Sequence, residues 1–211
     1  MPRLSKAAVH ERRQDLVTVA QQLFLTQGYD NTTVNQIIAT LNLAKGTYYY
    51  HFRSKEDILI AVSDRLIGDT QEKLRAAHQR RDKDVLWRIR EMLSIFHDDF
   101  YRNRAIWTLV YHDRNIALHK QVSDIGAKKF TPLLEDVLQE GIDERLIQVP
   151  HAHEAAQVLI SMFDTFSRQL CASRGHEKKV RIFETLRHMI GRILSKDCIP
   201  EFKGASDAAR Q

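Results

Sequence analysis

The sequence predicts an all-α protein with a sizeable hydrophobic core. Apolar residues make up 43% of the 211 residues, and they recur at helical spacing along most of the chain. Only 8 Gly and 4 Pro occur, which leaves little of the turn chemistry that a many-stranded β protein needs. The predicted organisation is a small N-terminal helical domain followed by a larger helical domain.

Charge and cysteine content indicate a soluble, reduced protein. The net charge is +5, and the first 56 residues carry seven Lys or Arg against four acidic residues. This mild excess permits a polyanionic partner without requiring one. With only Cys171 and Cys198, no disulfide framework is readable. The N-terminus lacks the apolar stretch of a signal peptide, and no run approaches a membrane span. We therefore expect a cytoplasmic protein with no membrane association.

The first quarter of the chain predicts four helices in quick succession. An apolar stripe of Leu16, Ala20, Leu23 and Phe24 precedes Gly28, which is suited to end a helix. Thr33 and Gln36 have the spacing of a capping box and open a short second helix that ends at Asn42. A third short helix is predicted over 45–52, and Ser54 caps a fourth.

The rest of the chain also reads as successive helices. They are predicted near residues 85–100, 106–111, 115–147, 150–174 and 182–193, with Pro132 breaking or kinking the third of these near Thr131. The predicted domains are a DNA-binding domain over 1–54 and a helical domain over 55–199. Residues 200–211 are expected to be a disordered tail.

The short helices before Ser54 have the pattern of a helix-turn-helix, whose second helix enters the DNA major groove. Tyr48 and Phe52 are four residues apart and are predicted to pack inward. The side chains then left outside suit phosphate oxygens, base edges and thymine methyl groups, and they are Lys45, Thr47, Tyr49, Tyr50 and His51. Phosphate contacts are also expected at the Gly46 backbone, at Thr33 and at Lys55.

A tyrosine run is often plain core, and a short basic segment also arises by chance. The order of features is far less common. Gly-Tyr is followed by Thr-Thr-Val, a short apolar helix, Lys-Gly-Thr, aromatics, His-Phe and Ser-Lys-Glu-Asp. This order favours DNA binding over the plain-core interpretation.

Residues 12–59, and LFLTQGYDNTTVNQIIATLNLAKGTYYYHFRSKEDIL in particular, resemble the N-terminal DNA-binding domain of the TetR/AcrR family of bacterial transcriptional regulators. The resemblance covers roughly a quarter of the chain. It implies an all-α homodimer on a palindromic operator, with a C-terminal domain that binds a small effector and dimerises through its last two long helices. It also implies DNA contacts at Thr33, Lys45, Thr47, Tyr49, Tyr50, His51 and Lys55.

The sequence departs from the family pattern at a few positions. Asn42 stands in place of the usual turn glycine, and asparagine tolerates that backbone conformation. Ile38 and Ala44 replace a usual alanine and serine, and Ala44 thereby removes a capping hydroxyl. The departures leave the resemblance intact.

The larger domain carries more aromatic side chains than a core of this size usually needs. Each is either core or part of a cavity wall, and the candidates for a ligand site are Trp87, Phe96, Phe100, Trp107, Tyr111, Phe163 and Phe166. No compact cluster of charges is expected to face that cavity, so the expected ligand is apolar or aromatic. The histidine and acidic clusters match no standard metal site, and no cofactor is expected.

The leading interpretation is a repressor that a small effector releases from DNA. The alternative is a DNA-binding regulator without a small-molecule effector, controlled by a protein partner or by its own abundance. Catalysis is not expected, because the sequence offers no nucleophile–base set, phosphate loop or metal quartet.

Overall fold

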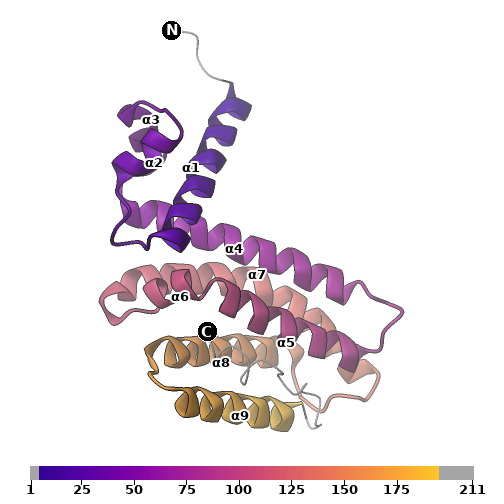
Figure 1. Ribbon diagram of the computed structural model, residues 1–211. Coiled ribbons are helices and arrows are strands. Elements are labelled where there is room, and N and C mark those ends of the chain that lie inside the picture. Colours follow the sequence, from indigo (N-terminus) through magenta and orange to yellow (C-terminus); the bar gives the residue numbers. More distant parts are fainter. Residues whose placement is uncertain (1–4, 195–211) are drawn as a thin grey trace. The chain divides into compact units, whose positions relative to one another are not determined.

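The computed structural model describes residues 5–194, and the regular structure in that part of the chain is helical (Figure 1). The predicted all-α fold is confirmed. The helices are α1 (Lys6–Thr26), α2 (Val34–Thr40), α3 (Lys45–His51), α4 (Lys55–His78), α5 (Val85–Arg102), α6 (Arg104–Val110), η1 (Asp113–Asn115), α7 (Ile116–Asp143), α8 (Ala152–Ala172) and α9 (His176–Ile193). None of the helices between residues 5 and 194 has the length and apolar composition of a membrane span.

The chain forms two compact units, one ending at Leu66 and the other beginning at Ile67. Helix α4 contributes to both, because it runs without interruption from Lys55 to His78. The predicted end of the DNA-binding domain after Ser54 separates the residues that bind DNA from those that bind an effector and dimerise. Compact units do not test such a boundary, so it stays a prediction. The predicted tail over 200–211 and Cys198 lie outside the described residues.

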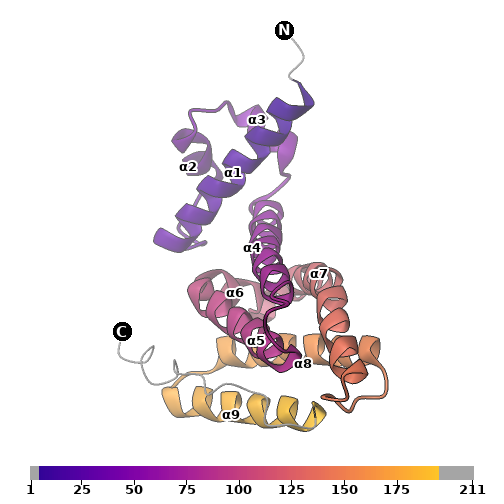
Figure 2. The ribbon, with the colours of Figure 1, turned by 90° about the vertical axis from the view of Figure 1, so that its right-hand side faces the viewer.

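The first unit is a small helical domain in which α2 lies against α1 and α3 (Figures 1 and 2). Its largest buried side chains come from all four helices and include Leu16, Phe24, Ile37, Tyr48 and Ile58. The Ser5 hydroxyl caps α1 by accepting a bond from the Ala8 amide at 3.1 Å. Burial of their apolar side chains in this core therefore stabilises α2 and α3, which at 7 residues each are too short to be stable alone.

Two residues with positive φ shape the turns of this unit. Gly28 has φ +84° just beyond α1, where the chain must turn away from the helix. Asn42 has φ +51° between α2 and α3, so asparagine takes the left-handed conformation that the sequence predicts for it. The tight α2–α3 turn that a helix-turn-helix requires is therefore present.

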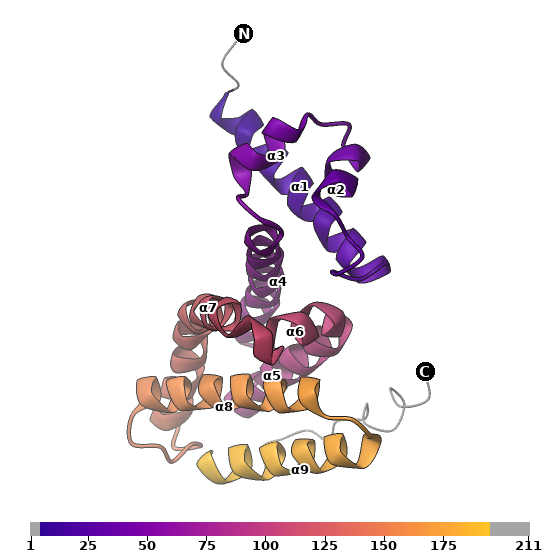
Figure 3. The same cartoon turned by 90° about the vertical axis from the view of Figure 1, so that its left-hand side faces the viewer.

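The second unit is a helical bundle in which α7 packs along α8 and α5 packs on α7. Helix α9 runs back along α8, as Figures 1 and 3 both show. The core of this bundle is formed by apolar side chains, among them Leu74, Ile89, Met92, Val137, Leu138 and Leu194. This bundle supplies the walls of the cavity described below.

Of the break or kink predicted near Thr131, the break is wrong, because α7 continues as one helix through Pro132. A kink at that position stays a prediction. Pro132 has no N–H group to donate to the Lys128 carbonyl, four residues earlier in the helix. The next carbonyl, that of Lys129, accepts a bond of 2.9 Å from the Gln71 side chain of α4. Helix α4 therefore contacts α7 in the turn that precedes the proline.

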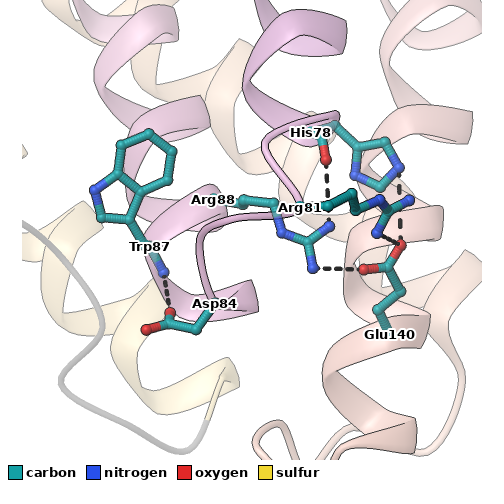
Figure 4. Close-up of polar contacts among 6 residues, drawn as sticks. All are labelled: His78, Arg81, Asp84, Trp87, Arg88 and Glu140. Atoms are coloured by element: carbon teal, nitrogen blue, oxygen red, sulfur yellow. Dashed lines mark hydrogen bonds and ion pairs between the residues drawn. The ribbon is translucent and has the colours of Figure 1, made fainter.

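An ion cluster joins the C-terminal end of α4 to α5 and α7 (Figure 4). Glu140 accepts bonds from the guanidinium groups of Arg81 and Arg88, and the Arg88 contact is 2.6 Å. Burial alone would raise the pKa of Glu140, but these hydrogen bonds outweigh burial and lower it. Arg88 also donates to the His78 carbonyl at 3.3 Å. Nearby, Asp84 caps α5 by accepting from the Trp87 amide at 2.7 Å.

We expect Glu140→Gln to lower the free energy of unfolding by about 1–3 kcal/mol, because it leaves a buried guanidinium without its carboxylate. Arg88 is only 3% exposed, so water cannot replace Glu140. The control is Glu135→Gln, which breaks an exposed pair with His153 and should cost less than about 1 kcal/mol. Urea denaturation measures both. Equal losses in the two variants would show that the cluster contributes no more than a surface pair.

Candidate functional site

Helix α3 presents a polar and aromatic face to solvent. Tyr48 is fully buried and its hydroxyl donates to the Ser54 carbonyl at 2.9 Å, while Phe52 is only 3% exposed. Tyr49 and Tyr50 are 48% and 73% exposed. The Lys45 ammonium lies 5.9 Å from the centre of the Tyr49 ring. The inward packing of Tyr48 and Phe52 is confirmed, and it leaves Lys45, Tyr49 and Tyr50 exposed.

The other predicted contacts on α3 are arranged around that face. Gly46 is exposed at the start of the helix, and Thr47 and His51 are half-buried. Burial lowers the pKa of His51, and the nearby Arg13 guanidinium lowers it further. His51 therefore offers a neutral imidazole at neutral pH, suited to hydrogen bonding rather than to charge pairing.

Thr33 stands at the N-terminus of α2 in the predicted capping box. Its hydroxyl accepts from the Gln36 amide at 3.2 Å, and the Thr33 amide donates to the Gln36 side chain at 2.7 Å. The hydroxyl also lies 3.0 Å from the Gln36 side-chain oxygen. Thr33 is exposed, but its hydroxyl already serves the helix.

Lys55 has a structural partner that the sequence did not reveal. Its ammonium donates to the Tyr29 carbonyl at 2.8 Å and to the Thr32 carbonyl at 3.0 Å. It also lies 4.1 Å from the centre of the Tyr29 ring. A lysine has three N–H donors, so one remains for an outside acceptor. Sequence reasoning also missed Arg13, whose guanidinium lies 5.1 Å from the centre of the Phe52 ring.

The second unit contains a cavity of about 370 Å³. Five of the predicted ligand-site aromatics line it, and they are Phe96, Phe100, Trp107, Tyr111 and Phe163. Phe130 completes the aromatic wall, with its ring centre 4.9 Å from that of Phe96. Sequence reasoning missed Phe130, although Val122, Gly126 and Phe130 follow one another at helical spacing on the same wall.

The remaining two predicted aromatics lie elsewhere. Trp87 is half-buried beside the cations of Arg80 and Lys83, each 5.7 Å from its ring. Phe166 packs against Phe183, with ring centres 4.8 Å apart. Both positions are outside the residues that line the cavity.

The expectation that no compact cluster of charges faces the cavity stays a prediction, but the wall does carry carboxylates that the sequence did not indicate. Asp99, Asp124 and Asp164 all line it. Asp164 comes from α8, whereas Asp99 comes from α5 and Asp124 from α7, so they share one cavity wall only when the bundle packs. Local periodicity does not indicate this convergence.

A second hollow of about 880 Å³ lies along α8 and α9. Its wall includes Val158 and Met189, which are 52% and 48% exposed, together with Met162, Ile182 and Leu186. We call this surface the α8–α9 groove. Within residues 5–194, no group of three or more His, Cys, Asp or Glu side chains gathers that could hold a metal ion.

Residues 16–62 match the model of the tetR family of bacterial regulatory proteins. An HTH-type transcriptional regulator from the lacX 3′ region of Lactococcus lactis subsp. lactis is 27% identical over 134 residues, which span 64% of this chain and 67% of that protein. The HTH-type transcriptional repressor NemR of Escherichia coli is 23% identical, over 82% of this chain and 91% of its own.

A TetR-family transcriptional regulator from Pectobacterium atrosepticum has a similar solved structure. The two structures superpose with a TM-score of 0.77 and 18% identity, over 92% of this chain and 99% of that chain. The likeness therefore extends through both compact units and concerns the fold.

Proposed function

The chain belongs to the TetR family of bacterial regulatory proteins, and from this membership we propose that it is a repressor released from a palindromic operator by a small effector. Regulators of this family bind DNA, act as dimers and are not enzymes. The repressor NemR aligns with most of the chain, which supports the repressor role. The proposal that an effector releases the protein from DNA rests on the aromatic cavity of the second unit.

We assign recognition of the DNA sequence to the exposed face of α3. Lys45 suits the O6 and N7 acceptors of guanine, and the Tyr49 and Tyr50 rings suit thymine methyl groups. The surrounding groups are assigned phosphate contacts, and they are Thr33, the Gly46 backbone, Thr47, His51 and the free N–H of Lys55.

Helix α4 supplies a physical link between effector and DNA. Ile67 and Thr70 of α4 line the cavity, while Ile58 and Leu59 of the same helix are buried in the core of the first unit. An effector that contacts α4 therefore acts on a helix whose first part belongs to the DNA-binding unit. To change DNA affinity tenfold, the effector must bind the two states of the protein with affinities that differ by about 1.4 kcal/mol.

The α8–α9 groove is assigned to the dimer contact. Its exposed apolar side chains would be covered by the same groove of a second copy, as a two-fold interface requires. Such a dimer would present two α3 helices to two half-sites of DNA, which supports a palindromic operator.

We expect Val158→Glu combined with Met189→Glu to dissociate the dimer, because the two carboxylates would be buried without partners at the interface. Sedimentation at micromolar concentration should give a dimer for the parent chain and a monomer for the double variant. Ile116→Glu is the control, since Ile116 is 74% exposed and lies outside the groove. A monomeric parent chain would overturn the assignment.

Release by an effector is tested with a thermal-shift screen followed by DNA binding. A ligand of the folded state raises the melting temperature, and an effector among the hits should weaken operator binding. We expect Trp107→Ala and Phe163→Ala to lose most of that response, because each removes part of the cavity wall. Trp87→Ala is the matched control outside the cavity and should keep it. If no ligand changes operator binding, release by an effector is wrong, and the protein is controlled by a protein partner or by its own abundance.

A further inference from the structure

The cavity of the second unit carries negative charge on its wall. Asp99, Asp124 and Asp164 line it, and none of the described residues that line it is Lys, Arg or His. The charge of Asp99 is balanced, because the Lys73 ammonium lies 2.6 Å from its carboxylate. Asp124 and Asp164 are left to set the electrostatic character of the cavity.

Asp164 is held in place by donors from neighbouring helices. The Tyr111 hydroxyl lies 3.3 Å from one of its oxygens, His119 Nε2 lies 3.1 Å from both, and the Ser123 hydroxyl donates to it as well. These bonds fix the position of the carboxylate, and its side chain is still 29% exposed. The His119 contact becomes an ion pair when the imidazole is protonated.

Asp124 lies on the same wall and is exposed. Among residues 5–194, no side chain forms an ion pair or hydrogen bond with it in the structure. A ligand cation would therefore meet one oriented carboxylate and one without a partner. Water or a cation must satisfy Asp124 when the cavity is filled, because Asp164 already accepts bonds from the protein.

The rest of the wall suits the body of an organic cation. The Phe96 ring lies 4.9 Å from Phe130 and 5.0 Å from Phe163, centre to centre, so the three rings form a continuous surface. Trp107 and Phe100 line the same space. Aromatic faces attract cations as well as apolar groups. A volume of about 370 Å³ is within the range of small-molecule sites.

We propose that the ligand of this cavity is an organic cation, a protonated amine or quaternary ammonium group on an aromatic or apolar body. Its positive group lies against Asp164 and Asp124, and its body packs between the aromatic rings. The statement that this ligand acts as the effector rests on the proposed function. The statement that the cavity binds it does not.

The test uses three probes of one shape and different charge. They are biphenyl-4-ylmethyl-trimethylammonium, its neutral isostere with carbon in place of nitrogen, and biphenyl-4-ylmethanesulfonate. Calorimetric titration of the full chain should show the cation binding at least tenfold more tightly than the neutral probe, with the sulfonate weakest. A neutral probe loses affinity because it leaves carboxylates in an apolar site without a counter-charge.

Substitutions of the two carboxylates test whether they cause the preference for the cation. Asp164→Asn and Asp124→Asn should each weaken the cation several-fold or more, while the neutral probe changes little or binds better. The amide that Asp164→Asn introduces keeps an acceptor for Tyr111, and Asp124 is exposed, so either variant alone reports on charge if the other fails to fold. Asp69→Asn is the control, because Asp69 is an exposed carboxylate of α4 outside the cavity.

The outcomes separate this inference from the proposed function. A cation preference that the Asp variants abolish and Asp69→Asn preserves supports it, even if operator affinity does not change, in which case only release by an effector is wrong. Equal or tighter binding of the neutral probe overturns the inference and leaves an effector cavity in place. A cation that fails to bind also overturns it.

Discussion

Tyr48→Ala is expected to abolish binding to every DNA sequence, because it removes the centre of the first unit's core. Tyr48 is fully buried, and its ring centre lies 5.8 Å from that of Phe52 and 5.4 Å from that of Tyr49. Replacing a buried aromatic side chain with alanine costs about 3–5 kcal/mol. A domain of this size has little stability beyond that.

The measurements are a denaturant titration and a DNA-binding assay on the full chain. Tyr48→Phe is the matched control, since it keeps the ring and removes only the hydrogen bond to the Ser54 carbonyl, worth about 1 kcal/mol. Tyr50→Ala removes an exposed ring from the same helix and should leave stability nearly unchanged. If Tyr48→Ala binds DNA as the parent does, α3 is not the DNA-binding helix.

The second large effect is the loss of sequence discrimination in Lys45→Ala. Lys45 lies on the first turn of α3, and it is exposed, so its ammonium is free to reach a base edge. We expect a loss of about 1–3 kcal/mol on the operator and a relaxed preference at one base pair of each half-site. Affinities for the operator and for single-base variants of it measure this.

Lys55→Ala is the comparison, because Lys55 is assigned to a phosphate. It should weaken operator and random DNA alike and lower the salt slope by about one unit. It should also lower the melting temperature, since its ammonium bonds the Tyr29 and Thr32 carbonyls. Lys45→Ala should not. If both variants lose affinity uniformly across DNA sequences, Lys45 is only another phosphate contact.

Local features of the fold were predictable because short-range chemistry determines them. The Thr33–Gln36 capping box, the left-handed Asn42 and the inward Tyr48 each follow from residues within a few positions of one another. A capping box forms with its helix, and the spacing of Tyr48 and Phe52 places both on one face. The helix-turn-helix was therefore readable from the sequence.

Contacts between distant segments were not predictable. Lys55 meets carbonyls 23 and 26 residues away, and His119 meets Asp164 across 45 residues. Helical periodicity indicates which face is buried but not which face meets it. The carboxylates on the wall of the cavity come together through such pairings, and so does the contact of Gln71 with the Lys129 carbonyl beside Pro132.

The most direct test of a sequence-reading dimer is selection of DNA by the purified full chain from a random pool. The selected sequences should contain two inverted half-sites, and the best of them should bind far more tightly than scrambled DNA of the same length and composition at one salt concentration. Enrichment of a single half-site would contradict the dimeric arrangement. Equal affinity for selected and scrambled DNA would contradict sequence reading by α3 itself.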